Sequence, residues 1–145
     1  MSAGVAAYDL TPALGVIGAG IVIALLPLAW FWRRRRLAGP AARLHALALL
    51  VLFLSFDLVL LGAFTRLSDS GLGCPDWPGC YGHASPLGAN PAIASAEAAV
   101  PTGAVTVTKA WIEMAHRYSA TAIGVLVVIL AALAIRSARR HDDAI

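Results

Sequence analysis

The chain has 145 residues, of which 59% are hydrophobic and 13% are charged, and its mean hydropathy is +0.77. A water-soluble domain carries about twice this charged share, so the composition excludes a soluble globular protein. The formal net charge is +3. The distribution of this charge along the chain indicates membrane topology, and no nucleic-acid partner is expected.

The apolar residues form three blocks that are long enough to cross a bilayer: residues 13–32, 44–65 and 111–135. A helix of about 20 residues, rising about 1.5 Å per residue, crosses a hydrocarbon core of ~30 Å. The sequence therefore predicts an all-α integral membrane protein with three transmembrane helices.

Basic residues are concentrated on one side of these predicted spans. The link 33–43 and the tail 136–145 hold eight of the eleven basic residues: Arg33, Arg34, Arg35, Arg36, Arg43, Arg136, Arg139 and Arg140. Because basic residues mark cytoplasmic segments, we expect the link and the tail to be cytoplasmic. The tail 1–12 and the long loop 66–110 should then lie on the outer side. A cleavable signal peptide is not expected, because the charges of the first span follow its apolar run.

The segment 65–82, TRLSDSGLGCPDWPGCYG, carries both cysteines of the chain, Cys74 and Cys80. Its Gly, Pro, Asp and Trp residues suit neither a long helix nor a regular strand, and such a loop cannot lie against lipid. In an oxidising compartment, two thiols six residues apart can form a structural disulfide. The alternative is a redox-active pair that exchanges with another thiol. A zinc site is not expected, because only His83 lies nearby.

A second chemical feature is the start of the third span, where Glu113 and His116 share one helix face at i and i+3. If this helix begins near Ala110, His116 lies about 9 Å below its outer end. Ionisable groups at this depth usually face a protein interior or a cavity. A histidine there can ligate haem iron, and Glu113 could hydrogen-bond, relay a proton or act as a base. The alternative is an interfacial cluster of Glu113, His116 and Arg117 that reaches to the lipid headgroups.

The other ionisable residues near the spans suggest simpler roles. Asp57 lies inside the second span, where we expect a hydrogen bond to a neighbouring helix. His45 and His141 lie near the cytoplasmic face among arginines and should be solvated, and His83 belongs to the outer loop.

Two runs together resemble one known family. Residues 62–82 read GAFTRLSDSGLGCPDWPGCYG, and residues 109–124 read KAWIEMAHRYSATAIG. In this order, and separated by an outer loop, they are similar to the N-terminal part of the haem A synthase (CtaA/Cox15) family over about residues 44–135. The resemblance implies a bacterial inner-membrane oxidoreductase. Its reaction would be oxidation of the C8 methyl of haem O to the formyl of haem A for cytochrome oxidase.

The resemblance also implies roles for individual residues. His116 would ligate the iron of haem b or of the substrate haem O, and Glu113 would be a catalytic carboxylate at the same haem edge. Arg66 and Arg117 could pair with haem propionates through charge-assisted hydrogen bonds. Cys74 and Cys80 match the outer-loop pair, which forms a disulfide in many members, and this loop would be periplasmic.

The chain departs from the family in the number of its helices. The family core has two related four-helix halves with histidine ligands on several helices, whereas only His116 lies at ligand depth here. We therefore expect the three spans to be part of a larger helical bundle. Either the chain is a fragment or truncated gene product, or a second chain or a copy of this one completes the bundle. Cytochrome oxidase biogenesis proteins are further possible partners. Two alternative functions remain: a haem-binding assembly subunit without catalysis of its own, and a membrane thiol-disulfide protein that uses Cys74 and Cys80.

Overall fold

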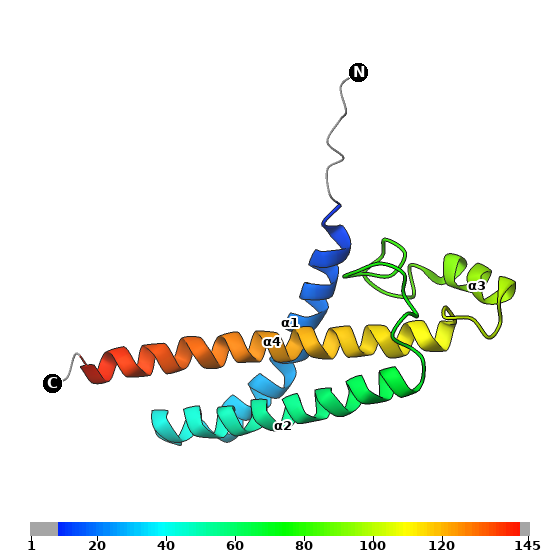
Figure 1. Ribbon diagram of the computed structural model, residues 1–145. Coiled ribbons are helices and arrows are strands. Elements are labelled where there is room, and N and C mark those ends of the chain that lie inside the picture. Colours follow the sequence, from blue (N-terminus) through cyan, green and yellow to red (C-terminus); the bar gives the residue numbers. More distant parts are fainter. Residues whose placement is uncertain (1–8, 143–145) are drawn as a thin grey trace.

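The structure, a computed structural model, describes residues 9–142 and is helical with irregular connections (Figure 1). Residues 1–8 of the predicted outer tail and residues 143–145 of the predicted cytoplasmic tail lie outside the described residues. The helices are α1 (Thr11–Arg34), α2 (Pro40–Leu67), α3 (Asn90–Ala99) and α4 (Val107–Asp142). Over the described part the only β pairing is an isolated bridge between Cys80 and His83, so the predicted all-α class is confirmed.

Three of the helices are long and apolar enough to cross a membrane: Thr11–Arg34, Pro40–Leu67 and Val107–Arg139. Each contains one predicted span and extends beyond it by several residues. The extensions mix basic and polar residues with alanine, proline, leucine and valine, and they remain helical because the backbone hydrogen bonds of a helix continue past its apolar part. Both α1 and α2 begin with a proline in the first turn, where the missing N–H leaves no hydrogen bond unmade. The chain is thus a helical membrane protein.

Helix α4 is the central element, because both other long helices pack on it. Figure 1 shows α2 running alongside α4, while α1 crosses α4. At the crossing, Gly20 of α1 lies so close to Thr121 of α4 that a Cβ would come within 2.5 Å of the threonine methyl carbon. Small residues of this kind allow membrane helices to approach each other closely.

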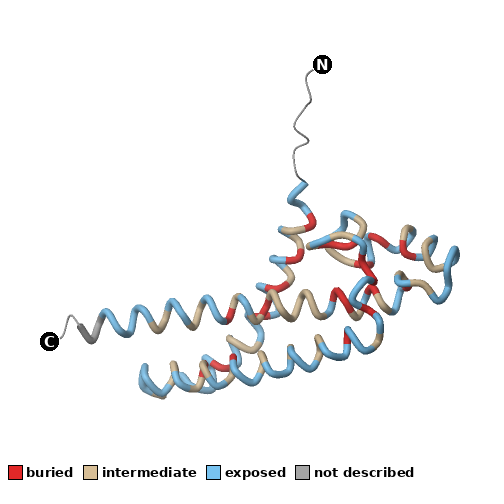
Figure 2. Tube along the Cα trace, in the orientation of Figure 1, coloured by how far each residue is buried: buried red, intermediate tan, exposed pale blue. Residues whose placement is uncertain are grey.

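The core is divided into two clusters along α4. The cluster near the link between α1 and α2 contains Ala24, Phe31, Leu47, Val51, Ala122 and Leu126. The cluster near the cysteine-bearing loop contains Val16, Cys74, Cys80, Ala89, Ile93, Ala110 and Met114. Most of the remaining surface of the long helices is exposed (Figure 2). These surfaces are available to lipid or to further helices.

Helix α3 lies inside the segment that was predicted only as a loop. Its Ile93 is 1% exposed and packs in the cluster near the cysteines. Glu97 of α3 accepts a hydrogen bond from the backbone N–H of Val107, the first residue of α4, at 3.1 Å. Helix α3 therefore fixes the point where the long loop turns back into the third span.

Candidate functional site

The cysteine loop, residues 65–82, covers the first turns of α4. Cys74 and Cys80 form the predicted disulfide, which is confirmed. Cys74 is 4% exposed and Cys80 is 0% exposed. Thiol-disulfide exchange requires direct attack of a thiolate on sulfur, so this burial hinders exchange in the described conformation. The disulfide acts as a staple inside a packed cluster.

Asp76, between the two cysteines, holds the loop in its shape. Its carboxylate accepts hydrogen bonds from the backbone N–H groups of Tyr81 and Gly82, the latter at 2.8 Å. Both of these residues have positive φ, 48° and 73° respectively. An Asp side chain commonly stabilises such turns by accepting backbone hydrogen bonds. Asp76 was not predicted as a site residue, because its hydrogen-bond partners lie five and six positions later, beyond the two-residue reach of a usual Asp turn.

Glu113 and Arg117 attach this loop to α4. One carboxylate oxygen of Glu113, Oε2, accepts a hydrogen bond from the Cys74 backbone N–H at 2.7 Å, and Oε1 forms an ion pair with Arg117. Arg117 also donates to the carbonyl oxygens of Asp76 at 2.8 Å and of Gly79 at 2.5 Å. Glu113 is 6% exposed. The pair thus contacts the loop at Cys74 and at two positions between the cysteines.

His116 faces α2 instead of the loop. A Cβ placed on Gly62 of α2 would lie 3.1 Å from Cε1 of the imidazole, so the ring occupies the space that this glycine leaves. His116 Nδ1 is buried and has no hydrogen-bond partner, and no other buried side-chain nitrogen or oxygen of the described residues is in this state. Because α4 begins at Val107, the histidine lies about 13 Å along the helix from its first residue.

Arg66 lies on the same face of α2 as Gly62, one turn further along. Its side chain is exposed, and none of the ion pairs within the described residues involves it. The structure thus places His116 and Arg66 on one flank of the α2–α4 contact. Glu113 and Arg117, in contrast, are directed to the loop.

Other ionisable residues lie outside this arrangement. Asp57 is exposed on α2 and makes no hydrogen bond to another helix of the described chain, and His45 and His83 are also exposed. An ion pair that the sequence analysis missed joins Lys109 to Asp69 at 2.8 Å, next to the start of α4. A pairing across about 40 residues has no local signal in the sequence.

These features define a helical membrane protein in which a disulfide-stapled loop caps a histidine-bearing helix. The family COX15-CtaA, described as cytochrome oxidase assembly protein, matches residues 45–144, and the chain belongs to this family. The heme A synthase of Shewanella oneidensis is 49% identical over 72 residues. That match covers 50% of this chain and 22% of the relative, so the chain corresponds to a minor part of that protein's length. No solved structure matches the chain.

Proposed function

We propose that this chain contributes part of a haem A synthase, which oxidises the C8 methyl group of haem O to the formyl group of haem A. Family membership and the similarity to a heme A synthase support this reaction class. The observation that carries the proposal is the imidazole of His116. It is held against Gly62 with a buried nitrogen that has no hydrogen-bond partner.

The residues present suit a haem group. Leaving a buried polar atom unsatisfied costs about 1–3 kcal/mol, so a group that engages the imidazole would relieve part of this cost. Haem iron commonly takes a histidine nitrogen as its ligand. Haem O would be the substrate, and a second haem, haem b, would supply electron transfer. His116 would orient the ring, and Arg66, one turn outward from Gly62, would donate charge-assisted hydrogen bonds to a propionate.

Glu113 and Arg117 are proposed to serve the same site, and their contacts suggest how. Both carboxylate oxygens of Glu113 already accept hydrogen bonds, one from the Cys74 N–H and one from Arg117. A carboxylate in this state is poorly prepared to remove a proton, so we infer that it acts by holding the cysteine loop above the site. Arg117 already donates hydrogen bonds to carbonyl groups of the same loop. Arg66 is therefore the better candidate to pair with a haem propionate.

The missing part of the site would come from further helices. The aligned part of the heme A synthase is 22% of its length, and a single imidazole does not complete a two-ligand haem site. We propose that a second chain, or a copy of this one, supplies the other helices in a bacterial inner membrane. The concentration of arginines in the α1–α2 link supports a periplasmic position for the cysteine loop.

The burial of both cysteines supports a structural disulfide over a function in thiol-disulfide exchange. The test uses the full chain, expressed with an ample haem supply and purified in detergent. The wild type and His45→Ala should show a haem Soret band, because His45 is exposed at the other end of α2. His116→Ala should lose this band, whereas Cys74→Ser should keep it. Survival of the band in His116→Ala would refute haem ligation by this residue, and so would absence of the band from the wild type when it is co-expressed with a chain that carries the remaining helices.

The reaction itself requires the complete bundle. The chain would be co-expressed with a chain that carries the remaining helices, in cells without a haem A synthase of their own. Extracted haems would then be separated by chromatography. Haem A should appear with the wild type and be lost with His116→Ala. If haem binds but only haem O accumulates with the wild type, the catalytic proposal fails and the alternative of a haem-binding assembly subunit is favoured.

A further inference from the structure

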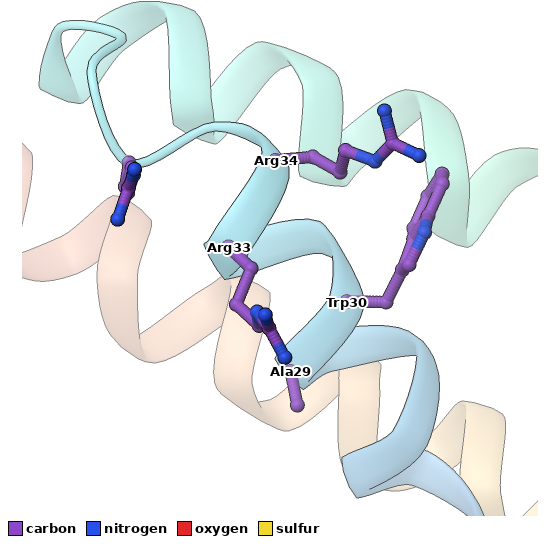
Figure 3. A pocket seen from close by; sticks show the side chains of 5 residues that line it. Ala29, Trp30, Arg33 and Arg34 are labelled. Carbon is purple, nitrogen blue, oxygen red and sulfur yellow. The ribbon is translucent and has the colours of Figure 1, made fainter.

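A pocket of about 550 Å³ lies at the end of α1 that is remote from the cysteine loop. Its lining residues are Ala29, Trp30, Arg33, Arg34 and Arg36. The first four lie on the last turns of α1, at spacings that place them on one face, and Arg36 follows in the turn toward α2 (Figure 3). Figure 3 shows the guanidinium of Arg34 beside the indole of Trp30, whereas the Arg33 side chain extends separately toward Ala29.

The charge of this pocket is not balanced within the described chain. No acidic residue occurs between Asp9 and Asp57, and the two ion pairs formed by the described residues both lie at the opposite end of the helices. Arginines near the C-terminal end of a helix are favoured by the helix dipole. That effect is confined to the last turn and is weak, so it does not neutralise three full charges.

Arg43 does not line the pocket; it stabilises the turn between α1 and α2. Its Nε donates to the carbonyl oxygen of Arg35 at 3.1 Å, and its NH2 group donates to the carbonyl oxygen of Arg36. The backbone N–H of Ala38 donates to the Arg35 carbonyl at 3.0 Å. These bonds fix the backbone from which the Arg36 side chain extends. The backbone at Arg36 is therefore preorganised, whereas the side chains of Arg33, Arg34 and Arg36 are exposed.

Trp30 shows where the pocket lies relative to the bilayer. Its indole is 59% exposed, and the guanidinium of Arg34 lies 5.7 Å from the ring centroid. Tryptophan is enriched at the boundary between hydrocarbon and headgroups. The membrane-crossing candidate Thr11–Arg34 also ends at this level. The arginines are thus expected at the depth of lipid phosphates, and the indole and Ala29 at the depth of the glycerol and upper acyl chains.

We propose that this pocket binds the phosphodiester headgroup of an anionic glycerophospholipid from the surrounding bilayer. Arg33, Arg34 and Arg36 donate charge-assisted hydrogen bonds to the phosphate oxygens, for which the planar guanidinium is well suited. Trp30 packs beside the glycerol. The volume is within the range of about 300–1,000 Å³ that is usual for small-molecule sites. The exposed indole of Trp30, at the end of a membrane-length helix, favours a lipid over a soluble phosphate. The site is separate from the haem site proposed above.

The test measures lipid binding to the full chain in neutral detergent by native mass spectrometry, with phosphatidylglycerol and phosphatidylcholine as the probes. The wild type should retain phosphatidylglycerol in preference to phosphatidylcholine. The variant R33Q/R34Q/R36Q should lose affinity for phosphatidylglycerol on the order of 100-fold, since each arginine at a membrane surface contributes to anionic-lipid attraction. The matched control R136Q/R139Q/R140Q removes the same charge from the end of α4 and should change the affinity little.

A third variant, R33K/R34K/R36K, keeps the positive charge that guides membrane insertion but removes the guanidinium forks. It should bind phosphatidylglycerol more weakly than the wild type while still inserting normally. Equal binding by the lysine variant, or an equal loss in the α4 control, would mean diffuse attraction to charge and would overturn the proposed site. Displacement of the lipid by an excess of inorganic phosphate would also overturn it, in favour of a soluble-anion site.

Discussion

Replacing Glu113 by Gln should loosen the cysteine loop without unfolding the helices. The Glu113 carboxylate accepts a hydrogen bond from the Cys74 N–H at 2.7 Å and forms an ion pair with Arg117. The side chains of Glu113 and Arg117 are only 8% and 14% exposed, respectively. Removing one member of a buried ion pair typically costs about 3–5 kcal/mol, because the other charge is left without its partner. Glutamine has nearly the same shape but no charge, so this substitution isolates the electrostatic contribution.

The expected cost is below that range for two reasons. The glutamine carbonyl can still accept the Cys74 N–H, and Arg117 keeps the carbonyl oxygens of Asp76 and Gly79 as acceptors. Hydrogen bonds that involve a charged group contribute about 1.5–3 kcal/mol. We therefore expect loop opening to become easier by about 2–3 kcal/mol, which corresponds to roughly 30- to 150-fold in the open population.

The assay is the rate at which the Cys74–Cys80 disulfide is reduced by a soluble phosphine and then alkylated in the folded protein. Both sulfurs are buried, so reduction requires opening, and its rate follows the open population when opening and closing are fast. The disulfide of Glu113→Gln should be reduced roughly 30- to 150-fold faster than that of the wild type. The control is Glu97→Gln, the same substitution at a partly exposed carboxylate that accepts one backbone N–H from α4.

An unchanged rate for Glu113→Gln would refute the reasoning. So would equal acceleration by Glu97→Gln, since this would show a general effect of lost charge in the loop region. A double-mutant cycle with Arg117→Gln adds a second check, because residues in one ion pair show non-additive effects. If the two substitutions acted independently, the pair would not be the element that holds the loop.

Three further substitutions test neighbouring contacts. Gly73→Ala should release the loop and speed reduction of the disulfide, because a Cβ there would lie 2.5 Å from the backbone of Lys109. In the control Gly71→Ala the added methyl group meets nothing within 4 Å, so the reduction rate should not change. Gly62→Ala should shift the haem Soret band or weaken haem binding several-fold, because its methyl group would lie 3.1 Å from the imidazole of His116. An unchanged spectrum and affinity would contradict the proposed haem position. Asp69→Asn should cost less than about 1 kcal/mol by thermal unfolding, since the Asp69 side chain is 85% exposed; a larger loss would show that its ion pair with Lys109 is more than a surface contact.

The long helices were predictable because their signal is compositional. A run of about 20 apolar residues specifies a membrane helix whatever its neighbours are. Helix α3 (Asn90–Ala99) was missed, because it is short and rich in alanine and has little apolar periodicity to distinguish it from a loop. Its start carries the Asn90-Pro91 pair, and proline in the first turn is the one local signal that could have indicated it.

The residues of the candidate site were predictable, but their separate directions were not. Glu113 and His116 are three residues apart, which places them on neighbouring parts of one helix face. The structure directs Glu113 to the loop and His116 to α2. Arg117 contacts carbonyl groups of residues that precede it by 41 and 38 positions. Such non-local contacts depend on how the loop folds, which the local sequence pattern does not specify.

The exposed surface of α2 indicates why these helices belong to a larger bundle. Asp57 lies well inside this membrane-length helix, and it has no partner among the described residues. An aspartate at the centre of a membrane helix costs about 2.5–3.5 kcal/mol when it faces lipid, and such residues normally face protein or a polar cavity. Gly62 and Arg66 lie on the opposite flank of α2, next to His116. The Asp57 flank of α2 therefore carries a polar group that a neighbouring helix would satisfy, and a lone three-helix assembly would leave it facing lipid.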